Sequence, residues 1–171
     1  MTSNASAKNS AFKAHGLTRV RASGRLLYTD FTGPWNRELV MLWAQPVTAV
    51  ANELAAGGVY ATIVVVHGSM MCTPDAMVEL TRAAKLTFTQ FPCIAIAIVA
   101  GPEVEGRTLM KTQFENMSKG RGPLAYVHTL AQAEAFAHEQ LRLRAASGAP
   151  MGPEARIGLV SGDGAAGRGK S

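Results

Sequence analysis

The sequence lacks any apolar run of the roughly 20 residues that a membrane-spanning helix needs. Its clearest apolar runs, such as Cys93 to Ala100, have the length of a strand. The N-terminus is polar and basic and has no hydrophobic stretch, which argues against a secretory signal. We therefore expect a cytoplasmic protein without a membrane span.

Cysteine is also scarce, since Cys72 and Cys93 are the only two in the chain. Both lie in or beside apolar segments, so we interpret them as buried thiols in a reducing compartment rather than as a disulfide. The four histidines show no metal-ligand spacing with cysteines or carboxylates. Convincing carboxylate pairs for acid–base catalysis are missing as well. We predict no metal, no cofactor and no catalytic residue.

Aromatic residues make up 6% of the chain and hydrophobic residues 47%, so we expect a core of aliphatic side chains. The net charge is +5, and five basic residues that precede the first acidic residue, Asp30, account for it. From Leu26 to Arg144, nine basic residues face ten acidic ones. This distribution limits nucleic-acid binding to weak, non-specific contacts of the N-terminal arm.

Hydrophobic periodicity and turn residues predict one domain between two tails. We interpret residues 1–16 as a disordered basic arm, 17–145 as an α/β domain, and 146–171 as a disordered Gly/Ala-rich tail. The expected strands cover 17–21, 25–31, 60–66, 93–100 and 124–128, and the first two form a hairpin. Helices are expected over 36–55, from Thr73 to 90, over 104–118, and from Thr129 onward. This alternation predicts a small, mostly parallel sheet with helical crossovers.

The stretch from Gly24-Arg25-Leu26-Leu27, through the strand and loop from Ile63 to Met71, to about His138 resembles the STAS domain of the sporulation anti-anti-sigma factors. The segments Gly33-Pro34-Trp35-Asn36 and Thr73-Pro74-Asp75-Ala76 resemble uncharacterised bacterial STAS-like proteins. In the sporulation regulators, a strand leads into an Asp-Ser-Ser/Thr-Gly segment whose Ser is phosphorylated. Here Pro74 takes the place of that Ser, which puts the phosphorylation switch in doubt.

Thr73 has two interpretations. Its hydroxyl can cap the free amides of the following helix, with Pro74 in the first turn and Asp75 at the positive helix end. It is also the only hydroxyl at that helix start, and a phosphate there would meet free amides and the helix dipole. We favour the cap and keep Thr73 as a candidate phosphorylation site.

Two other motifs find no support in their surroundings. Gly164 to Ser171 matches the phosphate-binding P-loop pattern, but no helix follows it in this sequence. Val64-Val65-Val66-His67-Gly68-Ser69 is similar to the oxyanion loop of α/β-hydrolases, but no nucleophile elbow occurs in the chain.

The predicted function is a non-enzymatic, regulatory STAS-like module that binds a protein partner or a small apolar or anionic ligand. In parallel α/β sheets, the loops after the strands collect at one edge, where helix amides point outward. The binding residues predicted at that edge are His67, Ser69, Thr73, Asp75, Arg107 and Lys111. Two alternatives stay open: a small enzyme that uses His67 and Cys72, and a carrier of apolar ligands such as lipids. Oligomeric state is not predicted.

Overall fold

The computed structural model describes residues 13–148. These residues form an α/β domain with one five-stranded sheet, in the spatial order β1-β2-β3-β4-β5. The elements, in chain order, are β1 (Leu17–Ser23), β2 (Leu26–Thr32), α1 (Arg37–Ala56), β3 (Tyr60–His67), α2 (Pro74–Gln90), β4 (Cys93–Val99), α3 (Arg107–Ser118), β5 (Leu124–Val127) and α4 (Leu130–Ala146). The predicted α/β class and the order of its elements are confirmed.

Strands β2 to β5 are parallel, and β1 pairs with β2 as an antiparallel hairpin. The pairing extends from Leu17 opposite Thr32 to Ser23 opposite Leu26. The first strand is therefore two residues longer than predicted, whereas the second has the predicted length and is shifted by one residue. A tight turn suffices because Gly24 adopts a φ of +55°, a conformation that other residues rarely take.

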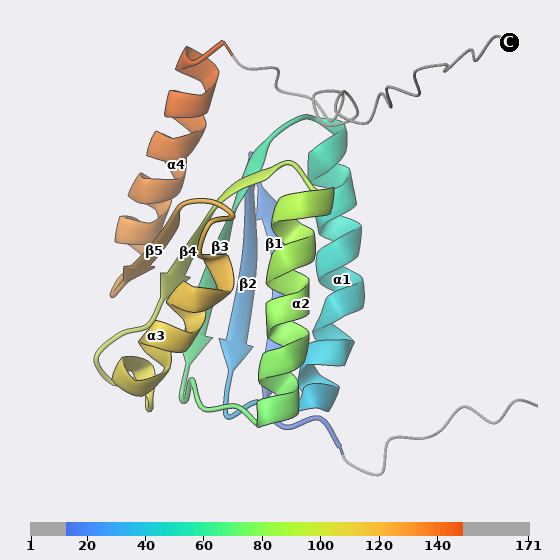
Figure 1. Cartoon of the computed structure of the whole chain (residues 1–171), viewed down its shortest axis with the longest axis vertical. Helices are drawn as coiled ribbons and strands as arrows, with labels where there is room; N and C mark the ends of the chain where they lie inside the picture. Colours follow the sequence, from blue (N-terminus) through green and yellow to red (C-terminus); the bar gives the residue numbers. More distant parts are fainter. Residues whose placement is uncertain (1–12, 149–171) are drawn as a thin grey trace, which may run out of the picture.

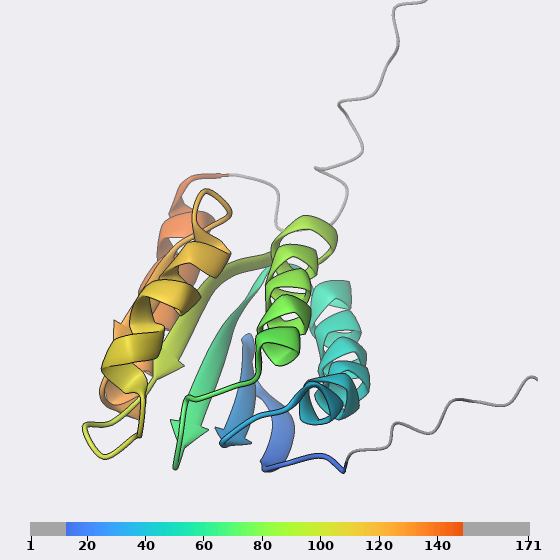
Figure 2. The same ribbon diagram turned by 60° about the horizontal axis from the view of Figure 1, so that its bottom comes forward.

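Three helices cover one face of the sheet, and α4 covers the other (Figure 1; Figure 2). The larger core lies under α1, α2 and α3, where residues such as Phe31, Trp43 and Phe114 are buried. On the opposite face, α4 contributes Ala133 and Ala137, which are buried against β3 and β4. Small side chains let α4 approach the sheet closely, whereas the other face contains the larger aromatic residues.

Local sequence signals set most helix starts. The Thr73 hydroxyl accepts a hydrogen bond from the Ala76 amide, and Thr129 forms the predicted capping box with Gln132. The third helix is an exception, because it begins at Arg107 and not near Val104. Glu105 instead pairs with the loop after β3 through its backbone, which holds this stretch out of the helix.

The contacts of the domain begin earlier than the predicted boundary at Leu17. The Asn36 side chain, which caps α1, donates to the Lys13 carbonyl and accepts from the His15 amide. Residues 13–16, which we placed in the arm, are therefore held against the start of α1. The rest of the arm and the C-terminal P-loop pattern lie outside the described residues. Within residues 13–148, no helix is long and apolar enough to span a membrane.

Candidate functional site

The loops at the carboxyl edge of the parallel strands are joined to one another by backbone hydrogen bonds. Trp35 forms backbone hydrogen bonds with the residues on both sides of Cys72. The Trp35 amide donates to the Met71 carbonyl, and the Thr73 amide donates to the Trp35 carbonyl. On the other side, the Met70 amide donates to the Glu105 carbonyl at 2.8 Å. Many amides that we expected to be free at this edge are thus already used within the fold.

Thr73 and Asp75 lie together at the start of α2. The Thr73 hydroxyl donates to Asp75 Oδ1, and the Ala76 amide lies 2.9 Å from Asp75 Oδ1 and 3.4 Å from Thr73 Oγ1. The hydrogen bond from Thr73 lowers the pKa of the Asp75 carboxyl. Both side chains are exposed. A phosphate on Thr73 would meet the Asp75 carboxylate, so this pair disfavours a second negative charge.

His67 and Ser69, the two predicted residues after β3, have separate roles. The exposed His67 ring lies 3.3 Å from Asp30 Oδ1, on the sheet face that α4 covers. Ser69 is buried, and its hydroxyl accepts the Met71 amide at 3.1 Å. His67 is therefore accessible to a ligand, whereas Ser69 stabilises the turn of the loop.

Arg107 and Lys111 lie on one side of α3 and form a third group with Tyr126 and His128. Arg107 Nη1 donates to His128 Nδ1 at 2.8 Å, and the Tyr126 hydroxyl donates to the Arg107 carbonyl at 2.8 Å. Lys111 Nζ lies 3.7 Å from Glu115 Oε1 and 5.8 Å from the Tyr126 ring centre. The six predicted residues therefore divide into three groups, with no hydrogen bond or ion pair found between the groups in residues 13–148.

The His67–Cys72 pair of the enzyme alternative is joined by no hydrogen bond within residues 13–148. His67 contacts Asp30, whereas Cys72 pairs through its backbone with Trp35. Burial, and then the charge of Asp75, raise the pKa of the Cys72 thiol, which is the opposite of what a nucleophile needs. The described residues contain no group of three or more His, Cys, Asp or Glu side chains that could hold a metal ion.

Cys72 should therefore react slowly with iodoacetamide at neutral pH, more slowly than free cysteine, because only the thiolate attacks. The rate should rise at a pH above that at which free cysteine, with a pKa of about 8.5, becomes reactive. Asp75→Asn should accelerate labelling, since it removes a negative charge beside the thiol. Peptide mass spectrometry separates Cys72 from the buried Cys93. Fast labelling at neutral pH that His67→Ala abolishes would revive the enzyme alternative.

Thr73→Ala should destabilise the fold by only about 0.5–1 kcal/mol, the low end for a helix cap, because Asp75 still accepts the Ala76 amide. The mutation also removes the hydrogen bond that lowers the Asp75 pKa. A carboxyl with a lowered pKa stabilises the fold above its unfolded pKa of about 3.9, and this contribution is lost as the pH falls further. Urea unfolding at several pH values should therefore show the gap between wild type and Thr73→Ala narrowing in acid. A constant gap would contradict this coupling.

A cavity that the sequence analysis did not identify lies beneath α2, between this helix and the sheet. Its volume is about 180 Å³, and its walls come from α1, α2, α3 and strands β2 to β5. The lining is almost entirely apolar, with Phe31, Tyr60, Ile96 and Ile98 on the sheet side. A second, shallower hollow of about 240 Å³ lies beside Thr73 and is bordered by the N-terminal segment.

The cavity exists because α2 presents small side chains to the sheet. Ala83, Ala84 and Thr87 line it, next to the larger side chain of Leu80. One methyl group per alanine cannot fill the space above β3 and β4. The sequence shows these alanines, but a run of good helix formers does not reveal how far the helix lies from the sheet.

Both tryptophans of the chain, Trp35 and Trp43, line the cavity. Trp43 Nε1 donates to Thr29 Oγ1 at 2.7 Å, so this buried indole is satisfied. Trp35 Nε1 is buried and finds no partner within the described part of the chain. Intrinsic fluorescence therefore reports on this cavity and, through Trp35, also on the second hollow, which Trp35 borders.

Comparison with known proteins yields little. No protein-family model matches the chain. No curated protein matches it. Among solved structures, the chain is similar to an uncharacterized protein of the DUF3478 family with a SpoIIAA-like fold from Shewanella loihica PV-4. The match covers 75% of this chain and 98% of that chain, with 13% identity and a TM-score of 0.48. This likeness is to a STAS-like fold, as the sequence resemblance predicts, and it concerns no binding or activity.

Proposed function

We propose that the protein is a non-enzymatic binding module that takes a small apolar ligand into the cavity beneath α2. The observation that carries this proposal is an apolar space of about 180 Å³ beneath α2. An engineered cavity of about 150 Å³ lined by Leu, Ile and Phe stays dry and binds benzene. A cavity of this size suits a single ring or a short alkyl chain.

The test uses 8-bromo-octan-1-ol, whose bromine quenches nearby indole fluorescence. Both tryptophans line the cavity, so binding there should quench the emission in a saturable manner. Ala84→Leu extends a larger side chain into the space and should weaken binding at least about tenfold, with the fold retained because the cavity accepts the added carbons. Ala84→Met provides a more flexible replacement if Leu is too bulky.

Ala131→Leu is the matched control, because Ala131 is exposed on α4, on the opposite face of the sheet. It should bind the bromo-alcohol as the wild type does. Saturable quenching that survives both Ala84 variants would show that the probe binds elsewhere, and absence of saturable quenching in the wild type would contradict the proposal.

A second candidate is a protein partner at the carboxyl edge, in keeping with the predicted regulatory role. The exposed side chains of Met71 and Leu109, with 37% and 69% of their surfaces accessible, support it. Met71 contacts the start of α3 near Gly106, and Leu109 follows in the first turn. Replacing both by Ser should reduce capture of a partner without altering the cavity. Cys72 and Cys93 are not joined by a disulfide, which suits action in the reducing cytoplasm.

A further inference from the structure

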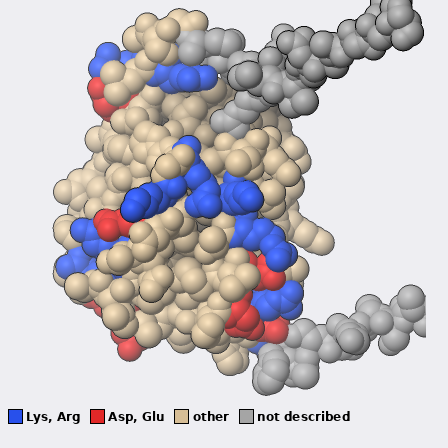
Figure 3. Space-filling model, in the orientation of Figure 1, with Lys and Arg blue, Asp and Glu red and all other residues tan. Residues whose placement is uncertain are grey.

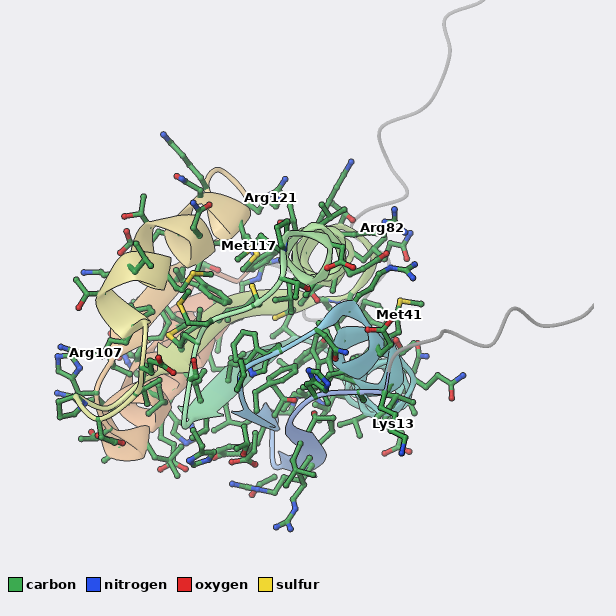
Figure 4. All side chains as sticks on the ribbon, turned by 90° about the horizontal axis from the view of Figure 1, so that it is seen from below. Lys13, Met41, Arg82, Arg107, Met117 and Arg121 are labelled. Carbon is green, nitrogen blue, oxygen red and sulfur yellow. The ribbon has the colours of Figure 1, made fainter. Side chains whose placement is uncertain are left out.

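Basic side chains lie beside the cavity wall between α2 and α3, a side that we take as the opening of the cavity. Arg121 lies beside the lining residue Met117, whose carbonyl accepts a hydrogen bond from the Arg121 guanidinium. Seen from below, Arg121 and Met117 lie on the side of α2 that faces α3, and Arg82 lies on its other side (Figure 4). Arg121 is therefore next to the wall of the apolar space.

Lys85 approaches the same opening from α2. It follows the lining residue Ala84 and precedes Phe88 by three positions, so Lys85 and Phe88 share one side of the helix. Phe88 packs against Gly122, because a Cβ on that glycine would lie 2.6 Å from Phe88 Cε1. Lys85 is therefore on the side of α2 that faces the loop after α3, which also contains Arg121.

The positive charge at this opening is not neutralised within the described part of the chain. Lys85, Lys119 and Arg121 are exposed, and none of them belongs to the ion pairs found in residues 13–148. The sequence contains no Asp or Glu from residue 80 to 102, or from 116 to 133. Figure 3 shows the resulting band of Lys and Arg side chains across α2 and the end of α3.

From this arrangement we infer that the ligand is amphipathic and anionic, with its apolar part in the cavity and a carboxylate or phosphate between Lys85 and Arg121. The inference rests on the proposed function and adds the chemical class of the ligand. Arginine and lysine are the side chains that bind such anions, and a charge at the rim avoids the cost of burial in the apolar interior. Lys119 adds to the attraction from the same loop.

The test compares 8-bromo-octanoate with 8-bromo-octan-1-ol, two monomeric probes with the same chain and quencher but different head groups. A purely apolar site prefers the alcohol, because a carboxylate loses more hydration on binding. A basic rim reverses this order, and we expect octanoate to bind about threefold to tenfold more tightly at low salt. The preference should vanish near 1 M salt, where the screening length is about 3 Å.

The double variant Lys85→Gln/Arg121→Gln should lose the preference for octanoate and bind the alcohol as the wild type does. Arg19→Gln is the matched control and should keep the preference. Arg19 is an exposed residue of the edge strand β1, none of whose residues lines the cavity. If neither probe quenches saturably, the proposed function fails. If both probes bind equally to the wild type, or the preference survives the double variant, the proposal of an apolar ligand in the cavity stands and the inference of an anionic ligand is overturned.

A bilayer could supply the same chemistry through its lipid head groups. Flotation with phosphatidylcholine vesicles that contain phosphatidylglycerol separates the two sources. We expect no more than weak, salt-sensitive flotation together with saturable binding of monomeric octanoate. Strong flotation without binding of the monomer would place the anion in a membrane surface and overturn the inference of a small ligand.

Discussion

Phe31→Ala should destabilise the domain by about 3–5 kcal/mol, the range for removing a buried aromatic side chain. The Phe31 ring lies at the centre of the larger core, 5.0 Å from the Trp35 ring centre and 5.2 Å from that of Trp43. Its side chain is 2% exposed and forms part of the cavity wall, so its removal joins a new void to the existing one. The free energy of unfolding of a domain is typically only about 5–15 kcal/mol, so this loss is a large fraction of the total stability.

Urea unfolding followed by circular dichroism measures the loss, and tryptophan emission should shift to longer wavelength as both indoles lose shielding. Phe136→Ala is the control, because Phe136 is half-buried against the core on the other face. The Phe136→Ala variant should lose clearly less free energy of unfolding than Phe31→Ala. A cost for Phe31→Ala below about 1 kcal/mol would mean that the core collapses around the site and that the cavity beneath α2 is not maintained by rigid walls.

The parts of the fold that follow from local chemistry were predictable from the sequence. Buried parallel strands appear as apolar runs, as in Cys93–Val99. Helix starts follow from cap residues such as Thr73 and Thr129, because the cap bond joins residues only a few positions apart. The alternation of these segments was then sufficient to predict the mostly parallel sheet.

The parts that depend on distant segments were not predictable in this way. The start of α3 is delayed because Glu105 pairs with the loop around Gly68, and nothing in the sequence near Glu105 specifies that partner. The same applies to the carboxyl edge, where pairing between loops uses amides that appear free in each loop alone. His67 and Cys72 are close in sequence but have different partners, Asp30 and Trp35.

The candidate site was hidden for a related reason. The distance of α2 from the sheet depends on side chains of several elements, including Trp43 from α1 and Phe114 from α3. The basic rim combines Lys85 with Arg121, from segments that the sequence analysis assigned to separate elements. From the sequence of its helix alone, Lys85 would be interpreted as a solvated surface charge. Only the packing of Phe88 against Gly122 shows that the side of α2 with Lys85 faces the loop that contains Arg121.

Gly33→Ala should cost several kcal/mol, because the site leaves no space for a methyl group. A Cβ built on Gly33 would lie 2.0 Å from the Ser69 carbonyl oxygen and 2.7 Å from Trp35 Nε1. The Ser69 loop cannot shift easily, since Gly33 donates to the His67 carbonyl and Met70 to that of Glu105. Relief would therefore break backbone bonds at the carboxyl edge, each worth about 0.5–1.5 kcal/mol, in addition to the strain of overpacking.

Gly120→Ala separates this steric effect from backbone strain. Gly120 has a φ of +73°, and a Cβ there would meet no atom within 4 Å. Alanine at Gly120 should therefore cost only about 1–2 kcal/mol, the penalty of a left-handed conformation. Thermal and urea unfolding of both variants compare the two costs directly. The close approach of the Gly33 and Ser69 loops would be contradicted if Gly33→Ala were as stable as Gly120→Ala, because the methyl group would then have found room between them.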